Sequence, residues 1–173
     1  MDPNRVVHYF GLREGMKVAD FGSGAGHFAI LMAKIVGETG TITAIDVMQS
    51  SLEALLGQAK AGNIQNIVTH RGDLEVPGGS GLAEASQDAV LLANVLFQSD
   101  KKTDILLEAG RILKSGGSII IINWQKGAGG LGPPDDMRST IEEIKTHGTG
   151  AGLQYAQSFD VGAYHFGLIL RKS

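Results

Sequence analysis

Short apolar runs alternate along this chain with stretches of helical periodicity. Seven runs have the length and the β-branched composition of strands: Lys17–Phe21, Thr41–Val47, Ile67–His70, Asp88–Asn94, Ser118–Asn123, Leu153–Phe159 and Ala163–Arg171. Strands that alternate with helices are typical of βαβ units around a parallel sheet. The pattern therefore predicts an α/β fold of the doubly wound type.

Glycine and capping residues mark where several helices are expected to begin and end. After residue 27, apolar side chains recur at i, i+3, i+4 and i+7, and Gly37 stands at the expected end of that helix. Ser50 with Glu53, and Ser139 with Glu142, have the spacing of a capping box, in which two side chains satisfy backbone amides of the first turn. We expect two further helices to begin at these pairs.

The second half of the chain adds a buried strand and an antiparallel pair. A helix predicted from about Asp100 to Leu113 stops at Ser115-Gly116-Gly117, and the strand Ser118–Asn123 holds four successive isoleucines, as in strands covered on both faces. The last two strands are joined by only a few residues. That short connection forces an antiparallel pair, because a parallel crossover needs about a dozen residues or more. Glycine-rich Glu75–Gln87 is predicted to be a loop with at most a helical turn.

The most specific chemical signal lies in residues 18–27, which read V-A-D-F-G-S-G-A-G-H. An apolar run ends there in an acid and is followed by three alternating glycines, which let a backbone turn tightly and approach a ligand closely. Asp46 follows twenty residues after the last glycine, at the end of the second apolar run. An acid at that position suits hydrogen bonds to a ribose diol, so the pairing predicts a nucleoside cofactor.

Asp20 indicates which nucleoside cofactor to expect. A dinucleotide places its pyrophosphate beside such a glycine loop at a helix N-terminus, where a carboxylate would repel it. S-adenosylmethionine instead brings a sulfonium and an α-ammonium group, which a carboxylate attracts. His27 also stands where the dinucleotide fingerprint requires a small residue. The sequence therefore favours S-adenosylmethionine over NAD.

Composition narrows the classes of function. The chain has 173 residues, 43% apolar content and a net charge of −3, which predicts a single domain over 1–173 with an N-terminal arm (1–16) and a core (17–173). Lysine and arginine are scattered, so no nucleic-acid partner is indicated. No apolar run approaches the roughly 18 residues of a membrane span and no signal peptide is recognisable, so a cytoplasmic location is expected. The lack of cysteine excludes thiolate metal sites and cysteine nucleophiles.

Four motifs together resemble the class I S-adenosylmethionine-dependent methyltransferases, most closely the ubiquinone/menaquinone-biosynthesis methyltransferase-like branch. They are V-A-D-F-G-S-G-A-G at 18–26, L-K-S-G-G at 113–117, G-P-P at 132–134 with Arg138, and Y-H-F-G at 164–167. The resemblance implies a Rossmann-like, seven-stranded, mostly parallel sheet in the order 3-2-1-4-5-7-6, with strand 7 antiparallel. Ser115 replaces the proline usual in K-P-G-G, which affects the rigidity of that turn.

The resemblance also assigns the residues expected to bind S-adenosylmethionine and its product S-adenosylhomocysteine. The methionine part is held by Asp20, Gly22, Ser23, Gly24, Gly26, Asn94 and Val95, the ribose hydroxyls by Asp46, and the adenine by Val47, Met48, Asp73 and Leu74 next to Gly72. Each falls at the carboxyl end of a parallel strand of the predicted sheet, at the edge where open α/β sheets bind ligands. No metal is expected, because the five histidines lack metal-ligand spacing and the strand-end Asn94 and Asn123 replace the carboxylates of metal-dependent catechol-type enzymes.

Residues for the methyl acceptor are less well defined. Phe97, Trp124, Arg138 and His165 are candidates for an acceptor pocket, since they lie on the segments expected to border it. No catalytic residue is assigned; His165 is a candidate base, and a hydrogen-bonded structural role is the alternative.

We expect methyl transfer by direct displacement to a small-molecule acceptor, whose identity the sequence does not reveal. The protein would act chiefly by holding two reactants together, so a dedicated base need not be present. Three alternatives stay open: an NAD(P)-dependent oxidoreductase, a catalytically inactive methyltransferase-fold partner subunit, and a protein or RNA methyltransferase with an extended groove. The oligomeric state is not indicated.

Overall fold

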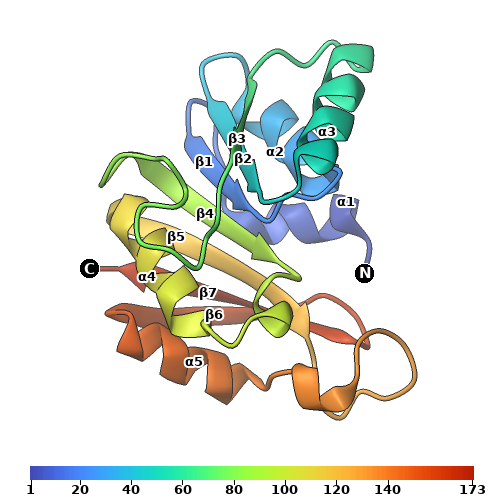
Figure 1. The fold of residues 1–173 in the computed structure, drawn as a ribbon, viewed down its shortest axis with the longest axis vertical. Helices are drawn as coiled ribbons and strands as arrows, with labels where there is room; N and C mark the ends of the chain where they lie inside the picture. Colours follow the sequence, from blue (N-terminus) through green and yellow to red (C-terminus); the bar gives the residue numbers. More distant parts are fainter.

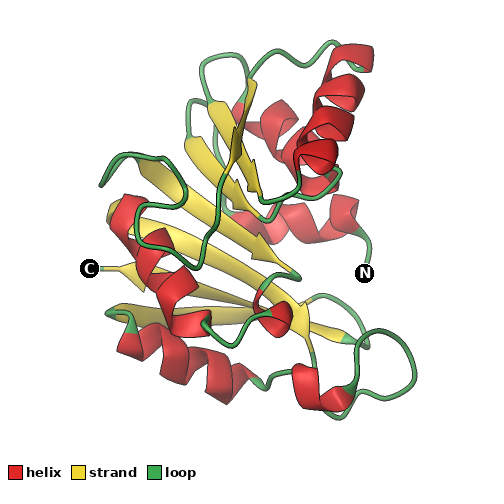
Figure 2. Cartoon of the chain, viewed as in Figure 1, coloured by secondary structure: helices red, strands yellow, loops and turns green.

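The computed structural model describes residues 1–173 and contains one seven-stranded sheet (Figures 1 and 2). Its strands are β1 (Lys17–Phe21), β2 (Thr41–Asp46), β3 (Ile67–Arg71), β4 (Gln87–Ala93), β5 (Leu113–Trp124), β6 (Leu153–Asp160) and β7 (His165–Lys172). They lie in the order β3-β2-β1-β4-β5-β7-β6, and β7 is antiparallel to both of its neighbours while the other pairings are parallel. The predicted fold class and strand order are confirmed.

Helices cover both faces of the sheet. They are α1 (Pro3–Val6), α2 (His27–Val36), α3 (Gln49–Ala61), α4 (Lys102–Ile112) and α5 (Ile141–Gly150), with short 3₁₀ turns η1 (Val7–Phe10), η2 (Leu96–Gln98) and η3 (Asp135–Met137). In Figure 2, α1 to α3 lie against one face and α4 and α5 against the other. Consistent with this, Ile120 and Ile122 of β5 belong to the core shared with α2, whereas Ile119 and Ile121 belong to the core shared with α4. The isoleucine run is therefore covered on both faces, as predicted.

Both predicted capping boxes are wrong in detail. Helix α3 begins without a side-chain cap, at Gln49, and Ser50 already lies inside it. The second box is shifted by one residue: Thr140 Oγ1 accepts from Glu143 N at 3.1 Å, and Glu143 Oε2 accepts from Thr140 N at 2.8 Å. The shift arises because Ser139 is buried and its amide donates to the carbonyl of Trp124, so the helix begins only after that contact.

Strand β5 begins five residues earlier than predicted. The chain leaves α4 at Ile112 and enters β5 at once, where Leu113 pairs with Gln87 across a register shift in β4. The motif at 113–117 therefore belongs to the strand and is not a separate turn. Tertiary pairing with β4 overrides the local tendency of Ser115-Gly116-Gly117 to form a turn.

The strand order reverses between β1 and β4, so the loops that follow these two strands diverge to opposite faces of the sheet. A crevice forms at such a point, at the carboxyl ends of the strands, and open α/β sheets bind ligands there.

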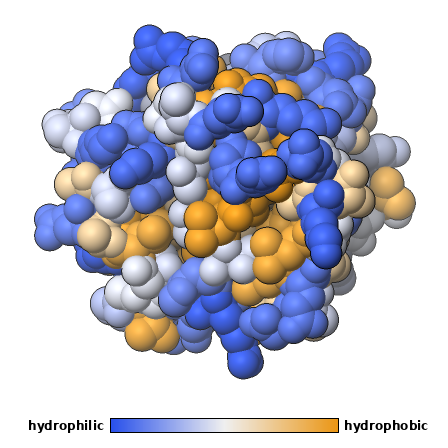
Figure 3. All heavy atoms as spheres, turned by 90° about the horizontal axis from the view of Figure 1, so that it is seen from above, coloured by the Kyte–Doolittle hydropathy of each residue, from blue (hydrophilic) through white to orange (hydrophobic).

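Strand β3 lies at one edge of the sheet, and its Val68 is 54% exposed. Figure 3 looks onto the end of the molecule that holds β3 and α3 and shows apolar side chains gathered near its centre, between polar ones. None of the helices has the length and apolar character needed to cross a membrane.

Candidate active site

Two adjoining hollows lie at the carboxyl ends of β1 to β4. The larger has a volume of about 550 Å³ and is bordered by the loops after these four strands and by the start of α4. The smaller, of about 210 Å³, lies beneath the glycine loop that joins β1 to α2. Gly22 and Asn94 line both, so the two hollows form one crevice. All thirteen residues assigned to the cofactor line one or the other: Asp20, Gly22, Ser23, Gly24, Gly26, Asp46, Val47, Met48, Gly72, Asp73, Leu74, Asn94 and Val95.

Asp46 fastens the glycine loop to the end of β2. Its Oδ2 accepts a hydrogen bond from Gly24 N at 2.9 Å, and its Oδ1 accepts one from Met48 N at 2.9 Å. The amides of Gly22 and Ser23 donate in addition to the carbonyl of Ile45. Each carboxylate oxygen has further lone pairs and faces the larger hollow. Asp46 can therefore hold the loop and accept hydrogen bonds from a ligand at the same time.

The glycines of this loop are required by close packing and by backbone conformation. Gly22 has a φ of 68°, and a Cβ atom there would lie 2.6 Å from Cγ2 of Val95. Gly26 has a φ of 87°, and its Cβ would overlap the side chain of Leu55 on α3. A φ in this range is strained for any residue with a side chain. The loop therefore reaches its position against α3 and β4 only with glycine at these two places.

Replacement of Gly26 by alanine should lower the free energy of unfolding by about 2–4 kcal/mol, from left-handed strain together with overpacking against Leu55. Gly57→Ala is the matched control, since Gly57 lies within α3 with open space around it and alanine there should stabilise the helix by about 0.5–1 kcal/mol. Urea unfolding of both variants measures the difference. Equal effects of the two substitutions would contradict the packing argument.

Three buried oxygen atoms around the smaller hollow lack hydrogen-bond partners: Asp20 Oδ2, Ser23 Oγ and Asn94 Oδ1. Asp20 is 2% exposed, and burial followed by the charge of Asp46 raises its pKa from 3.8 to about 7. Asn94 is held at a φ of 57°, in the left-handed region that non-glycine residues seldom adopt. Unpaired buried polar atoms are costly, and clustered ones mark a place where a ligand supplies the missing partners. This hollow is thus shaped to receive a hydrogen-bond donor, preferably a cationic one.

The larger hollow has an apolar wall and a polar rim. Val47 and Met48 are more than half exposed beside it, and the buried Leu74 borders it from the loop after β3. Asp73 Oδ1 accepts from Glu75 N at 2.9 Å, which fixes the turn that follows β3. A flat, partly polar ring fits such a combination of apolar surface and carboxylate.

Three of the four acceptor candidates lie together at the other side of the glycine loop. The ring centroids of Trp124 and His165 are 4.0 Å apart on paired positions of β5 and β7, and the Arg138 guanidinium lies 5.5 Å from the Trp124 centroid. Phe97 is half-buried on η2 and borders neither of the two hollows. The structure therefore groups Trp124, Arg138 and His165 with one another, and none of the four acceptor candidates borders either hollow of the cofactor crevice.

Arg138 organises the loop between β5 and α5. Its guanidinium is 6% exposed and donates to the carbonyls of Pro133 at 2.9 Å, Gly129 at 3.2 Å, Gln125 at 3.4 Å and Leu131 at 2.5 Å. These bonds account for most of the donors that an arginine offers. Arg138 thereby holds the loop closed over the Trp124 ring.

His165 is uncharged in this environment. It is buried, and its Nε2 has no hydrogen-bond partner. Burial, together with the positive charges of the amino terminus and of Arg138, lowers its pKa to about 4. A histidine with this pKa is a weak base at neutral pH, and its free ring nitrogen can still form a hydrogen bond with a bound molecule.

Several residues that border the larger hollow were not predicted from the sequence. They are Ser51, Glu75, Gln98, Ser99 and Ile105. Each lies a few positions beyond a strand end or at the start of a helix, and nothing in its type or spacing distinguishes it from neighbouring loop residues. Their proximity to the crevice depends on how the loops fold back over the sheet.

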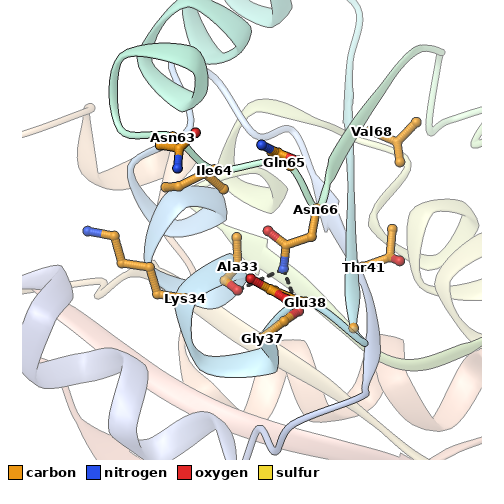
Figure 4. Close-up of a pocket in the computed structure, with 11 residues that line it drawn as sticks. Ala33, Lys34, Gly37, Glu38, Thr41, Asn63, Ile64, Gln65, Asn66 and Val68 are labelled. Atoms are coloured by element: carbon orange, nitrogen blue, oxygen red, sulfur yellow. Dashed lines mark hydrogen bonds between the residues drawn. The ribbon is translucent and has the colours of Figure 1, made fainter.

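A still larger hollow, of about 700 Å³, lies at the opposite edge of the sheet (Figure 4). It is bordered by the end of α2 and by the segments that lead into β2 and β3, and Asn66 Nδ2 donates there to the carbonyls of Ala33 and Gly37, each at 2.8 Å. None of the candidate site residues borders it. No buried, unpaired side-chain atom borders it, so its size alone does not make it a functional site.

Comparison with known proteins agrees with this geometry. The model of a methyltransferase domain family matches residues 12–160. The chain belongs to this family. The demethylmenaquinone methyltransferase of Staphylococcus aureus is 33% identical to this methyltransferase-family chain over 119 residues, which cover 68% of the chain and 47% of that protein. The chain thus spans about half the length of the curated relatives it matches.

Solved structures resemble this methyltransferase-family chain over nearly all of its length. A S-adenosylmethionine-dependent methyltransferase from Aquifex aeolicus superposes with a TM-score of 0.89 at 28% identity, covering 99% of this chain and 90% of that one. The [4+2]-cyclase SpnF superposes with a TM-score of 0.81 at 16% identity, covering 98% of this chain and 80% of that one. The second likeness shows only the fold, and SpnF is named for a different reaction, so the fold by itself does not determine the chemistry. The resemblance to class I methyltransferases stated from the sequence is confirmed.

Proposed function

We propose that this protein binds S-adenosylmethionine in the crevice at the carboxyl ends of β1 to β4 and transfers its methyl group to a small-molecule acceptor. The observation that carries the proposal is the set of three buried, unpaired oxygens of Asp20, Ser23 and Asn94 around the smaller hollow. An α-ammonium group supplies the donors and the positive charge that these oxygens lack. A pyrophosphate would bring only further acceptors and negative charge, which argues against NAD.

The larger hollow suits the adenosine part. Asp46 accepts hydrogen bonds from ribose hydroxyls, Val47, Met48 and Leu74 pack against the adenine, and Asp73 accepts from its amino group. Gly22, Gly24, Gly26, Gly72 and Val95 complete the walls by close approach of the backbone or by contact. These roles agree with the positions of the residues along the crevice, from the methionine end at β1 to the adenine end at β3.

Bound S-adenosylmethionine supplies a methyl group that its sulfonium already activates. The protein has to hold this group in line with the acceptor atom and exclude water, and such positioning contributes about 7–11 kcal/mol. Trp124 and His165, which are adjacent on β5 and β7 beside the loop that Arg138 holds, are the residues we propose to border the acceptor. Because the pKa of His165 is lowered to about 4, it orients the acceptor through Nε2 and is not a strong base.

A small acceptor fits the short segments that border this side of the crevice. They are η2, which has three residues, and the loop between β5 and α5. The curated relatives are named for methylating demethylmenaquinone, itself a small molecule. For this protein we therefore propose only the class of the acceptor, a small molecule.

Binding of S-adenosylhomocysteine, measured by isothermal titration calorimetry beside NAD, tests the proposal. We expect a dissociation constant in the micromolar range for S-adenosylhomocysteine, with a matching rise in melting temperature because the ligand binds only the folded state. NAD should give neither heat nor a melting shift. Binding of NAD alone would favour an oxidoreductase, and binding of neither ligand would favour an inactive partner subunit.

A further inference from the structure

The loop between β3 and β4, residues 72–86, is tightly folded although its sequence is rich in glycine. A Cβ atom on Gly72 would collide with the carbonyl of Gly79, and a Cβ on Gly79 would collide with the carbonyl of Asp73. Backbone bonds from Gly79 N to Val76 O at 2.8 Å and from Gly81 N to Gly78 O at 3.0 Å close two successive turns. The glycines therefore allow two parts of the loop to pack backbone against backbone.

Glu108 on α4 holds the tip of this loop. Its carboxylate is 3% exposed and accepts hydrogen bonds from Gly78 N at 2.9 Å, from Ser80 N at 3.2 Å and from the hydroxyl of Ser80. Arg111, one turn further along α4, donates to the same carboxylate through Nε and Nη2 at 2.8 Å and to the carbonyl of Leu82 at 2.7 Å. Against the upward effect of burial, these hydrogen bonds lower the pKa of Glu108 to about 2, so it is ionised at all working pH values.

The same loop and the same helix form one wall of the larger hollow. Gly72 to Glu75 border it from the beginning of the loop, and Ile105 borders it from α4. Ser99 Oγ, just before α4, donates to Glu75 Oε1 at 2.6 Å and ties the two parts together at the rim. Glu108 itself does not border the hollow and makes its bonds on the far side of the wall.

We propose that Glu108 is a positioning residue that fixes the adenosine-binding wall through the tip of the loop at 78–82. The inference rests on the proposed function. The loop tip lies in the middle of a long connection, and its side-chain hydrogen bonds to α4 come from the Glu108–Arg111 pair, in which Glu108 accepts from Gly78 and Ser80 and also holds Arg111 in place. Without the anchor the wall is assembled in only a fraction of the molecules, and the apparent dissociation constant of an adenosine-containing ligand rises by the inverse of that fraction.

Glu108→Gln keeps the shape of the side chain and removes its charge, which leaves Arg111 without its ionic partner. We expect the dissociation constants of S-adenosylhomocysteine and of 5′-methylthioadenosine to rise together by about tenfold, which corresponds to ~1.4 kcal/mol. Asp20→Asn provides the contrast, since Asp20 is proposed to contact the amino-acid part of the ligand. It should weaken the binding of S-adenosylhomocysteine but not that of 5′-methylthioadenosine, which lacks this part. Amide hydrogen exchange over residues 72–82 should become faster in free Glu108→Gln and slow again when ligand is bound.

Asp88→Asn is the control for loss of an ion pair away from the crevice, although this pair is partly exposed. Asp88 accepts from Lys114 Nζ at 2.6 Å and from Lys17 N at 2.8 Å, at the amino ends of β1 and β4, away from the crevice. The Asp88→Asn substitution should lower the stability of the protein without changing the dissociation constant of S-adenosylhomocysteine or of 5′-methylthioadenosine. Ser80→Ala, which removes only one donor to Glu108, is a milder variant that should give about a two- to threefold rise if Glu108→Gln does not fold.

Two results separate the inference from the function on which it rests. Unchanged dissociation constants for both ligands in folded Glu108→Gln and Ser80→Ala would overturn the role of Glu108 while leaving the cofactor site in place. Failure of the unsubstituted protein to bind S-adenosylhomocysteine would instead overturn the proposed function.

Discussion

Asp46→Ala should abolish measurable binding of S-adenosylhomocysteine, raising its dissociation constant by about 100-fold or more. The substitution removes the proposed acceptor for the ribose hydroxyls, and it also releases Gly24 N and Met48 N, each held by this carboxylate at 2.9 Å. Hydrogen bonds to a charged group contribute about 1.5–3 kcal/mol each, so the loss of two reaches the stated factor. The glycine loop would lose its tie to β2 at the same time as the ligand loses its partner.

Calorimetric titration of the variant with S-adenosylhomocysteine measures this effect. Asp160→Ala is a suitable control, because Asp160 also ends a strand and accepts from a backbone amide two residues later, Gly162 N at 2.9 Å. It lies on β6, at the other end of the sheet from β2, and its removal should leave the dissociation constant within about twofold. Retention of near-normal affinity in Asp46→Ala would contradict the ribose assignment.

Asp20→Asn should weaken the binding of S-adenosylhomocysteine and stabilise the free protein. In the free protein Asp20 is buried beside the charge of Asp46, and its pKa is raised from 3.8 to about 7. A group whose pKa is raised on folding binds more protons in the folded state, so stability falls as the pH rises from about 4 to about 7. The asparagine avoids this loss, which amounts to at most about 4 kcal/mol above pH 7. It also removes the negative charge that attracts the ammonium group.

The affinity of the unsubstituted protein for S-adenosylhomocysteine should depend on pH for the same reason. A bound cation favours ionised Asp20, so binding releases a proton below about pH 7 and tightens as the pH rises from 5 to 8. In Asp20→Asn the affinity should be lower, by about tenfold or more at pH 8, and nearly independent of pH over this range. Titrations in buffers of different ionisation enthalpy detect the released proton directly.

Thermal unfolding at pH 5 and pH 8 measures the stability effect, with Asp88→Asn as the comparison. The pKa of Asp88 is lowered: burial raises it, but the hydrogen bonds from Lys114 and Lys17 outweigh that effect. Its neutralisation should therefore destabilise the protein at pH 8, opposite in sign to Asp20→Asn. Destabilisation by both substitutions at pH 8 would show that Asp20 is ionised and satisfied in the free protein, against the proposed site.

Local patterns were sufficient for much of the fold. The isoleucines of β5 predicted a strand covered on both faces, and the short connection before β7 predicted the antiparallel pair. Errors occurred where a tertiary contact overrides a local signal. The second capping box formed at Thr140 and Glu143 because the amide of Ser139 donates to the carbonyl of Trp124. No local sequence pattern predicts this contact.

The sequence by itself determined the glycine loop and the acids at the ends of β1, β2 and β3, because each depends on neighbours along the chain and on the rule that parallel strands end at one edge. The strand order followed from the sequence only through its resemblance to the class I methyltransferases. Only the tertiary structure decided the raised pKa of Asp20, the grouping of Trp124 with Arg138 and His165, and the reach of Glu108 to Gly78, thirty residues away. Burial, electrostatic environment and long-range hydrogen bonds arise from packing between distant segments, so they exist only once the chain has folded.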